Sequence, residues 1–537
     1  MAFIKKDKLK SGVYLRIVES YRDENGKAKH RTLHQLGKVS DYTPKMLRRM
    51  GERLYELGGG NIRDLIGENI EELDRYNYGF YLIYWKIFRQ YGLDKTLDRI
   101  ALRKKLKFNL SNAVLLMLLE RLNDPTSKRE SYFNQEEYLG IEGVDLHHLY
   151  RSLDYLADHQ QLIQNCIYKS SRNLFNQSLD VVFYDVTTFY FDSDKVAEGS
   201  IRQKGFSKDG KVGKTQVLFG LLIDQHKQPI GYRIYRGDTF EGHTFEDALH
   251  SLKSNYNIDK VVVVADRGML SKNNLSLTQS SGYEFIVGER LKQLPREVQE
   301  RLLDLKKYER EWIMDPESED PIVVRYCITE HEGRTIIGTH SARRAKKDKA
   351  EREEKIDKAR DLIKNPSKLN AKARRFFITS QTGKVELDEA KIKKAERYDG
   401  ILAISTNATN LPMEQILDHY RNLYKIEHSF RTFKTHLETR PMFHWTDKRI
   451  EGHICLCYIG YALLNNLQTT LKKRKVKFSE KKLRKLIERM QVSHIRQGDK
   501  EFYLRSKLTD DTRLLLNRVG KKPLPALISK DQIISYL

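Results

Sequence analysis

The sequence has few cysteines, the residues that form disulfide bridges and bind soft metal ions. Only 4 of its 537 residues are cysteine, and no two of them form a CxxC pair. Cys455 and Cys457 would point in different directions on a helix, so the sequence supports neither a disulfide framework nor a thiolate zinc site. We therefore expect a protein of a reducing compartment.

Long apolar runs and secretory signals are also missing. The most apolar stretch, residues 454–467, is too short to span a bilayer and contains Asn465 and Asn466. The first apolar residues are followed at once by lysines, unlike a signal peptide. The sequence also lacks the GxSxG turn of a serine hydrolase. These absences predict a protein without a membrane partner that acts in the cytoplasm.

Positive charge is what the sequence has in excess. It contains 97 lysines and arginines against 73 acids, which gives a net charge of +24 and a pI of about 9.5. Such an excess favours a polyanionic partner, most simply nucleic acid, over a soluble protein with a merely basic surface. The densest basic run, residues 472–477, fits either phosphate contacts or a solvated patch.

Changes in periodicity predict several segments along the chain. An alternating amino-terminal stretch predicts a basic hairpin with its turn at Asn25-Gly26. Helical periodicity follows, then strands, then an interruption, then strands and helices again. The predicted boundaries enclose residues 1–43, 44–176, 177–288, 289–397, 398–475 and 476–537.

The strand-rich part predicts an α/β fold. Its elements follow the order βββαβαβ, beginning with a strand over residues 180–191 and including a valine-rich strand that ends at Asp266. A hairpin meander followed by right-handed crossovers is the order of an RNase H-like mixed sheet. In that topology strands one and four are neighbours, which places Asp185 near Asp266. Residues 289–397 interrupt the sheet pattern and are an insertion in this scheme.

Three carboxylates stand where polar residues are least expected. Asp185 lies in a buried-strand run, and Asp266 follows four valines and an alanine. Glu427 lies at the margin of the apolar stripe of a helix predicted over residues 413–437. The alternatives are turn-forming aspartates and an ion pair between Glu427 and Arg431. Convergence of the three acids would instead indicate a cation, since carboxylates against apolar surface need partners.

The chemistry of this set points to magnesium. Two Mg²⁺ ions, with Mn²⁺ as a substitute, would take hard carboxylate ligands and support phosphodiester chemistry. No histidine or cysteine set with ligand spacing is apparent for a softer metal.

The set resembles the DDE transposases of bacterial insertion sequences, in the branch with a Tyr-x2-Arg-x3-Glu-x6-Lys signature. Tyr420, Glu427 and Lys434 match that signature, whereas Leu423 stands at the arginine position and Arg431 is a possible substitute. The block that begins at Asp185, Ala265-Asp-Arg-Gly-Met, Thr439-Arg-Pro and the long stretch between Asp266 and Glu427 also look like those enzymes.

The resemblance implies metal-dependent cleavage at insertion-sequence ends and strand transfer into target DNA. Asp185, Asp266 and Glu427 would be the catalytic metal ligands, while Tyr420, Lys434 and Arg431 would contact DNA. Trp312 would either stack on a flipped base or pack in the core. A plain RNase H-fold nuclease and a catalytically silent DNA-binding protein derived from a transposase are the rivals.

The resemblance also assigns partners and roles to the segments. Double-stranded DNA, as terminal inverted repeats and target, would be bound by a homodimer in a synaptic complex at the bacterial nucleoid. Residues 44–176 would bind DNA ends or act as a scaffold, and residues 476–537 would serve dimerisation.

Overall fold

The computed structural model describes residues 2–60, 70–175, 180–196, 198–206, 210, 213–258, 261–269, 271–314, 321–364, 378–381, 384–498 and 500–536. The chain forms two compact units. The first comprises Met1–Arg75, Val492–Arg505 and Pro525–Ile533, and the second comprises Tyr76–Gln491, Ser506–Leu524 and Ile534–Leu537. The first unit is therefore built from both ends of the sequence.

The amino-terminal hairpin predicted from the sequence is present. A hydrogen-bonded turn joins its two strands: the Asp23 carboxylate accepts from the backbone amides of Asn25 (3.1 Å) and Lys27 (2.9 Å), and Gly26 has a φ of 74°. Positive φ at this position suits glycine. A further strand pairs with the hairpin, so the sheet has the order β1-β2-β3. The elements here are β1 (Ala2–Leu9), β2 (Gly12–Arg22), β3 (Ala28–Lys38) and α1 (Pro44–Leu57).

A second sheet of the first unit joins segments far apart in the sequence. Its strand order is β19-β18-β17-β4. The strands are β4 (Ile70–Asn77), β17 (Gln491–Gln497), β18 (Lys500–Arg505) and β19 (Leu527–Ser529). The helical periodicity of residues 44–176 predicts helices alone, and the strand β4 corrects this prediction. A short, largely exposed strand carries little hydrophobic pattern of its own, because its pairing is set by β17.

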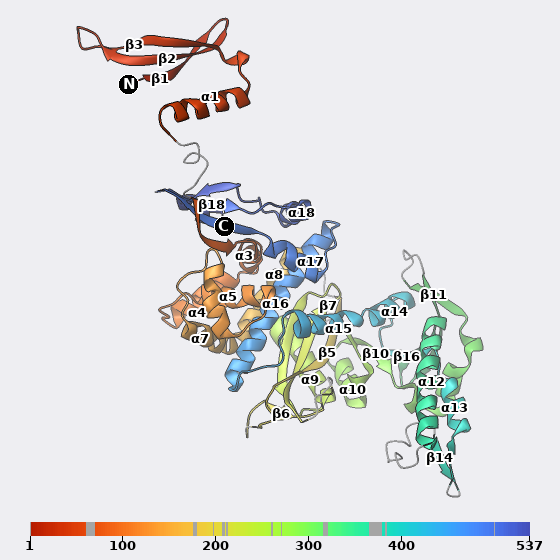
Figure 1. Cartoon of the computed structure of the whole chain (residues 1–537). Helices are drawn as coiled ribbons and strands as arrows, with labels where there is room; N and C mark the ends of the chain where they lie inside the picture. The colour runs from red at the N-terminus through yellow and green to blue at the C-terminus, as the bar shows by residue number, and fades with distance from the viewer. Residues whose placement is uncertain are drawn as a thin grey trace. The chain divides into compact units, whose positions relative to one another are not determined.

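The second unit is organised around a mixed sheet of ten strands among the described residues, with the order β11-β12-β13-β16-β10-β9-β5-β7-β6 and β8 beside β7 (Figure 1). Its strands are β5 (Val181–Tyr190), β6 (Gln203–Lys204), β7 (Thr215–Asp224), β8 (Pro229–Arg236), β9 (Val262–Ala265), β10 (Glu284–Glu289), β11 (Arg310–Met314), β12 (Ile322–His331), β13 (Arg334–His340) and β16 (Ile401–Thr406). The protein is thus of the mixed α/β class.

The central strands are buried, as their unbroken apolar runs predict. Every residue of β7 and of β9 is buried. The strand β9 lies parallel to both β5 and β10. The strands β11, β12 and β13 continue this same sheet through β16, so the stretch that interrupts the pattern in the sequence extends the sheet in space.

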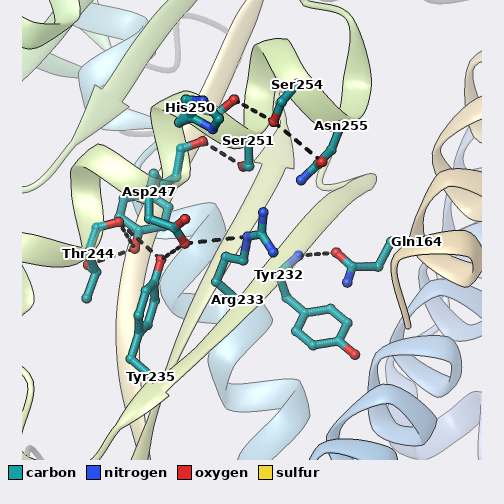
Figure 2. Close-up of polar contacts among 12 residues, drawn as sticks. Gln164, Tyr232, Arg233, Tyr235, Thr244, Asp247, His250, Ser251, Ser254 and Asn255 are labelled. Atoms are coloured by element: carbon teal, nitrogen blue, oxygen red, sulfur yellow. Dashed lines mark hydrogen bonds and ion pairs between the residues drawn. The ribbon is translucent and has the colours of Figure 1, made fainter. Parts of the chain in front are cut away.

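Helix α9 (Thr244–Tyr256) is fixed to β8 by polar contacts (Figure 2). The Tyr235 hydroxyl lies 3.1 Å from the Thr244 carbonyl oxygen and 3.0 Å from an Asp247 carboxylate oxygen. Arg233 forms an ion pair with Asp247 at 3.5 Å. On the same strand, the Tyr232 amide donates to the Gln164 side chain at 2.8 Å. These contacts hold the helix that precedes β9, and so help to place Asp266.

The remaining elements of the second unit are mostly helical. Among them, α16 (Asp447–Lys473) is buried over most of its length and contacts α5 and α7. The others are α3 (Gly79–Gln90), α4 (Leu93–Arg103), α5 (Leu110–Asn123), α6 (Lys128–Phe133), α7 (Leu146–Asp158), α8 (Gln160–Phe175), α10 (Lys272–Ser280), α11 (Arg296–Leu303), α12 (Ala342–Lys364), α13 (Glu389–Glu396), α14 (Met413–Arg421), α15 (Tyr424–Arg431), α17 (Glu480–Glu488) and α18 (Asp510–Val519), with a small hairpin of β14 (Ile378–Gln381) and β15 (Lys384–Leu387). No helix within the described ranges is long and apolar enough to cross a membrane.

The helix predicted over residues 413–437 is interrupted. Helix α14 ends at Arg421, α15 begins at Tyr424, and a π-helical turn covers Thr432–His436. At the junction, the Leu423 amide bonds to the Tyr420 carbonyl at 3.1 Å, which is the tighter i to i+3 spacing. The sequence shows one continuous apolar stripe here, but the changed helical geometry rotates residues before the break relative to Glu427.

Candidate active site

Strand pairing brings Asp185 and Asp266 together. The parallel register of β5 and β9 ends with Tyr184 opposite Ala265. The residue that follows each of these two is one of the acids, Asp185 or Asp266. Neighbouring strands lie about 4.8 Å apart. Asp266 is exposed just past its buried strand, whereas Asp185 is half-buried within β5 and accepts the Val186 amide at 2.7 Å. The sequence-based expectation that these two acids are neighbours agrees with this register.

Aromatic packing places the Glu427 helix over the strand pair that carries Asp185. The ring centroids of Phe430 and Phe433 lie 6.4 Å and 5.0 Å from that of Phe219 in β7. Phe219 is two residues from Leu221, which is the cross-strand partner of Asp185. Glu427 itself is exposed, at the margin of the buried stripe as its spacing predicts.

Asp266 and Glu427 line one cleft with a volume of about 660 Å³. Aromatic and cationic side chains make up much of the rest of its polar lining: Trp312, Tyr420, Tyr424, Arg267, Arg343, Arg344, Lys347 and Arg421. Asp185 is not part of this lining, and the oxygen atoms of the three acids are not all within 4.8 Å of one another.

The cleft suits a polyanion that approaches two acids. Five cationic side chains surround Asp266 and Glu427, which would attract phosphate groups to carboxylates that otherwise repel them. Arg267 follows Asp266 directly, while Arg343, Arg344 and Lys347 lie on α12. The sequence of α12 gives no signal for these residues, because a charged segment without an apolar stripe is typical of a solvated helix.

Tyr420 lies beside both acids of the cleft. Burial raises the pKa of its hydroxyl to about 12, and the charges of Asp266 and Glu427 act in the same direction, while Arg344 and Arg267 oppose them. The phenol therefore keeps its proton at neutral pH and can donate a hydrogen bond.

The other candidate residues are placed differently. Arg431 is exposed and Lys434 is half-buried in the π-helical turn, and neither lines the cleft. Arg421 does line the cleft, although a continuous helix would point it elsewhere; the break after α14 accounts for the difference. Trp312 lies half-buried in the cleft wall and not in the core, which contradicts core packing, one of the two alternatives for this residue.

One metal-ligand-like group appears outside the cleft. Among the described residues, the ligand atoms of Asp145, His147 and His148 lie within 4.8 Å of one another, contrary to the expectation that no histidine cluster exists. His148 Nδ1 already accepts the Asp145 amide at 3.1 Å. The group therefore has a structural role as a cap of α7.

Gly288 leaves the space that Tyr420 occupies. A Cβ atom at position 288 would lie 2.4 Å from the Tyr420 hydroxyl oxygen. We expect Gly288→Ala to lower the free energy of unfolding by about 1–3 kcal/mol through overpacking. Adding Tyr420→Phe should recover most of that loss, because the clashing oxygen is gone. Urea unfolding of the two single variants and the double variant measures this coupling. Strictly additive losses would contradict the contact.

Comparison with known proteins finds two sequence families that match the chain, and also similar solved structures. Residues 176–463, more than half of the chain, match the family model described as the transposase DDE domain. Residues 3–61 match the model described as the IS1634 family transposase, N-terminal domain. No curated protein matches the chain.

Among solved structures, the chain is similar to the piggyBac transposase in the cryo-EM structure of its synaptic complex with hairpin DNA. The TM-score is 0.36 with 9% sequence identity, over 76% of this chain and 78% of that chain. The family assignment rests on the sequence models. The chain belongs to the transposase DDE domain family and is a DDE transposase of an insertion sequence.

Proposed function

We propose that this transposase cleaves DNA at the ends of its insertion sequence and joins the exposed 3′-hydroxyl to target DNA. The observation that carries the proposal is the cleft in which Asp266 and Glu427 stand among five cationic side chains. The positive charge of the cleft lining suits a phosphodiester backbone held beside the carboxylates. Membership of the transposase DDE domain family supports the same reaction class.

We further propose that the catalytic core is RNase H-like. The support is the sheet order β8-β7-β5-β9-β10, with β5 antiparallel to β7 and parallel to β9. In this arrangement β5 and β9 are adjacent; Asp185 lies within β5, and Asp266 directly follows β9.

Asp185, Asp266 and Glu427 would hold divalent metal ions, with two Mg²⁺ ions as the proposed cofactor and Mn²⁺ as a substitute. The donor set fits, because all three residues offer hard carboxylate oxygens and two of them are exposed to incoming ligands. When bound, such ions activate an attacking oxygen and neutralise the leaving one.

The chain's own residues would bind and orient the DNA. Arg344 and Arg267 would neutralise phosphate charge along the cleft, and the protonated Tyr420 hydroxyl would donate to a phosphate oxygen near the acids. Lys434 and Arg431 remain proposed backbone contacts outside the cleft lining. The half-buried face of Trp312 offers an apolar wall for a base.

The proposed partners are the terminal inverted repeats and the target DNA, bound by a homodimer in a synaptic complex at the bacterial nucleoid. We propose that residues 44–176 bind DNA ends, that residues 289–397 are an insertion into the core formed by residues 177–288 and 398–475, and that residues 476–537 serve dimerisation. The amino-terminal hairpin, residues 1–43, would add a basic contact.

A strand-transfer assay tests the proposed reaction. The purified protein would be incubated with Mg²⁺, a labelled duplex that carries the element end, and a supercoiled target plasmid. We expect cleaved ends in one reaction and target joining from pre-cleaved 3′-hydroxyl ends in a parallel one. Cleavage without joining would indicate a nuclease, and DNA binding without either product would indicate a silent derivative.

A further inference from the structure

A second cavity, which we call the Lys128 pocket, lies apart from the acidic residues of the cleft. It has a volume of about 490 Å³ and forms where residues 121–128 meet residues 438–449. Its cationic lining residues are Arg121, Lys128, Arg440 and Arg449, against a single acid, Glu438. None of these residues lines the cleft of Asp266 and Glu427. The proposed reaction therefore leaves this pocket without a role.

Lys128 is a buried ammonium without a partner. Lys128 is 3% exposed, and among the described residues its side chain makes no hydrogen bond or ion pair. The nearby Glu120 carboxylate instead accepts from Tyr138 (2.7 Å), Thr126 (2.8 Å) and Asn134 (2.9 Å). Burial lowers the pKa of Lys128 to about 7, and the charge of Arg121 adds to this effect. A buried, unpaired cation is costly, so such a group is a candidate binding group.

Arg121 supplies a second unsatisfied donor. Its terminal nitrogens donate to the carbonyl oxygens of Leu437 (3.2 Å), Glu438 (3.4 Å) and Thr126 (3.1 Å), which ties together the two segments that form the pocket. Its Nε is buried and has no hydrogen-bond partner in the described structure. A guanidinium fixed in this way holds its positive charge beside the pocket, where it attracts an anion without further ordering of its side chain.

Aromatic side chains flank the cationic lining. Phe443 and Trp445 both line the pocket and are 72% and 61% exposed. The Arg202 guanidinium carbon lies 4.6 Å from the Trp445 ring and 5.4 Å from the Phe191 ring, which braces the indole from one side. Exposed rings beside a cationic pocket are the combination that binds a nucleotide, with the base on the ring and the phosphate on the cations.

The pocket lies beyond the far end of the strand that bears Asp185. The Met442 amide donates to the Tyr190 carbonyl at 3.1 Å, which fixes one pocket wall to the end of β5. Tyr190 is five residues after Asp185, and at about 3.3 Å per strand residue this separates them by roughly 17 Å. That length equals about five base-pair steps of duplex DNA, at 3.4 Å per step. A DNA strand at the acids can therefore extend to the pocket.

We propose that the Lys128 pocket binds a phosphate group of a DNA strand, with the adjoining base stacked on Trp445. The identity of the ligand as DNA rests on the proposed function, whereas the anion chemistry rests on Lys128 and Arg121. The phosphate is either a strand terminus or an internal phosphodiester.

Fluorescence anisotropy with Lys128→Met tests the proposal. The probes are single strands and duplexes of the element end, each with a 5′-phosphate or a 5′-hydroxyl, titrated in EDTA so that binding is measured without cleavage. We expect the substitution to weaken binding of at least one probe about tenfold, since it removes a charge-assisted phosphate contact. A loss of affinity only for the 5′-phosphorylated probes would show that the pocket binds a strand terminus. An equal loss of affinity for the phosphorylated and the hydroxyl probes would show that it binds an internal phosphate.

Two further measurements distinguish a ligand-binding role of Lys128 from a purely structural one. Without ligand, Lys128→Met should raise Tm by about 2 °C or more, because an unpaired buried charge has been removed. Pyrophosphate should raise Tm of the wild-type protein and not of the variant. Lys253→Met, which removes an exposed charge on α9, is the control and should change affinity less than twofold.

Unchanged affinity of Lys128→Met for every probe, or a lower Tm with no pyrophosphate effect in the wild type, would overturn the inference. These outcomes are separable from failure of the proposed function. A protein that binds DNA through Lys128 but makes no cleaved or joined product would contradict only the proposed reaction. A protein that cleaves and joins normally with Lys128→Met, and binds every probe unchanged, would contradict only the pocket.

Discussion

Replacing Asp266 with asparagine, or Glu427 with glutamine, is expected to slow DNA-end cleavage by about 10³-fold or more. The amides keep the shape of each side chain but lose the charge that holds a divalent ion. A bound ion lowers the activation barrier by several kcal/mol, so its loss slows cleavage. Asp185→Asn should have the same effect because its backbone adjoins that of Asp266. Single-turnover cleavage of a labelled element end, resolved on a denaturing gel, measures the rates.

Binding and a neighbouring acid provide the controls for this series. Each variant should still bind the element end, since removing a negative charge does not weaken attraction to phosphate. Asp194→Asn changes an exposed acid shortly after β5 and should cleave at the wild-type rate. Wild-type cleavage by any of the three site variants would remove that residue from the active site.

Phe433→Ala is expected to lower the free energy of unfolding by about 3–5 kcal/mol. Its ring is fully buried, with centroids 5.0 Å from Phe219 and 4.9 Å from Tyr461, so truncation leaves a cavity between β7, the π-helical turn and α16. Guanidinium unfolding measures the loss. Phe206→Ala is the matched control: that ring is 87% exposed, so the same deletion should change stability by no more than about 0.5 kcal/mol.

The same aromatic cluster connects this stability to the site. Phe430 and Phe433 attach the Glu427 segment to the strand that pairs with β5. A loss much smaller than 3 kcal/mol would show that these rings do not anchor the segment, and would contradict the placement of the Glu427 helix over β5 and β7.

Much of the central sheet can be predicted from the sequence, because its signals are local. The valine run before Asp266 and the strand of residues 215–224 are almost continuously apolar, which is typical of strands buried on both faces. The short link before Pro229 also indicates the antiparallel pairing of β7 and β8 that the structure contains. Register then follows from packing, which is why the neighbourhood of Asp185 and Asp266 could be expected.

The rest depends on contacts between distant parts of the chain. The strand β4 pairs with β17, more than four hundred residues later in the sequence. Neither strand has a sequence pattern that identifies its partner. The break between α14 and α15 has no glycine or proline signal, so Arg421 could not be placed in the cleft. Lys128 looks like an ordinary helix-start lysine in the sequence, and only tertiary packing buries it.

Anomalous scattering from Mn²⁺, in crystals of the protein with a pre-cleaved element end, tests the catalytic assignment most directly. We expect two peaks about 3.5–4 Å apart, each about 2 Å from carboxylate oxygens of Asp185, Asp266 or Glu427. Peaks confined to other groups, such as Asp145 with His147 and His148, would contradict it.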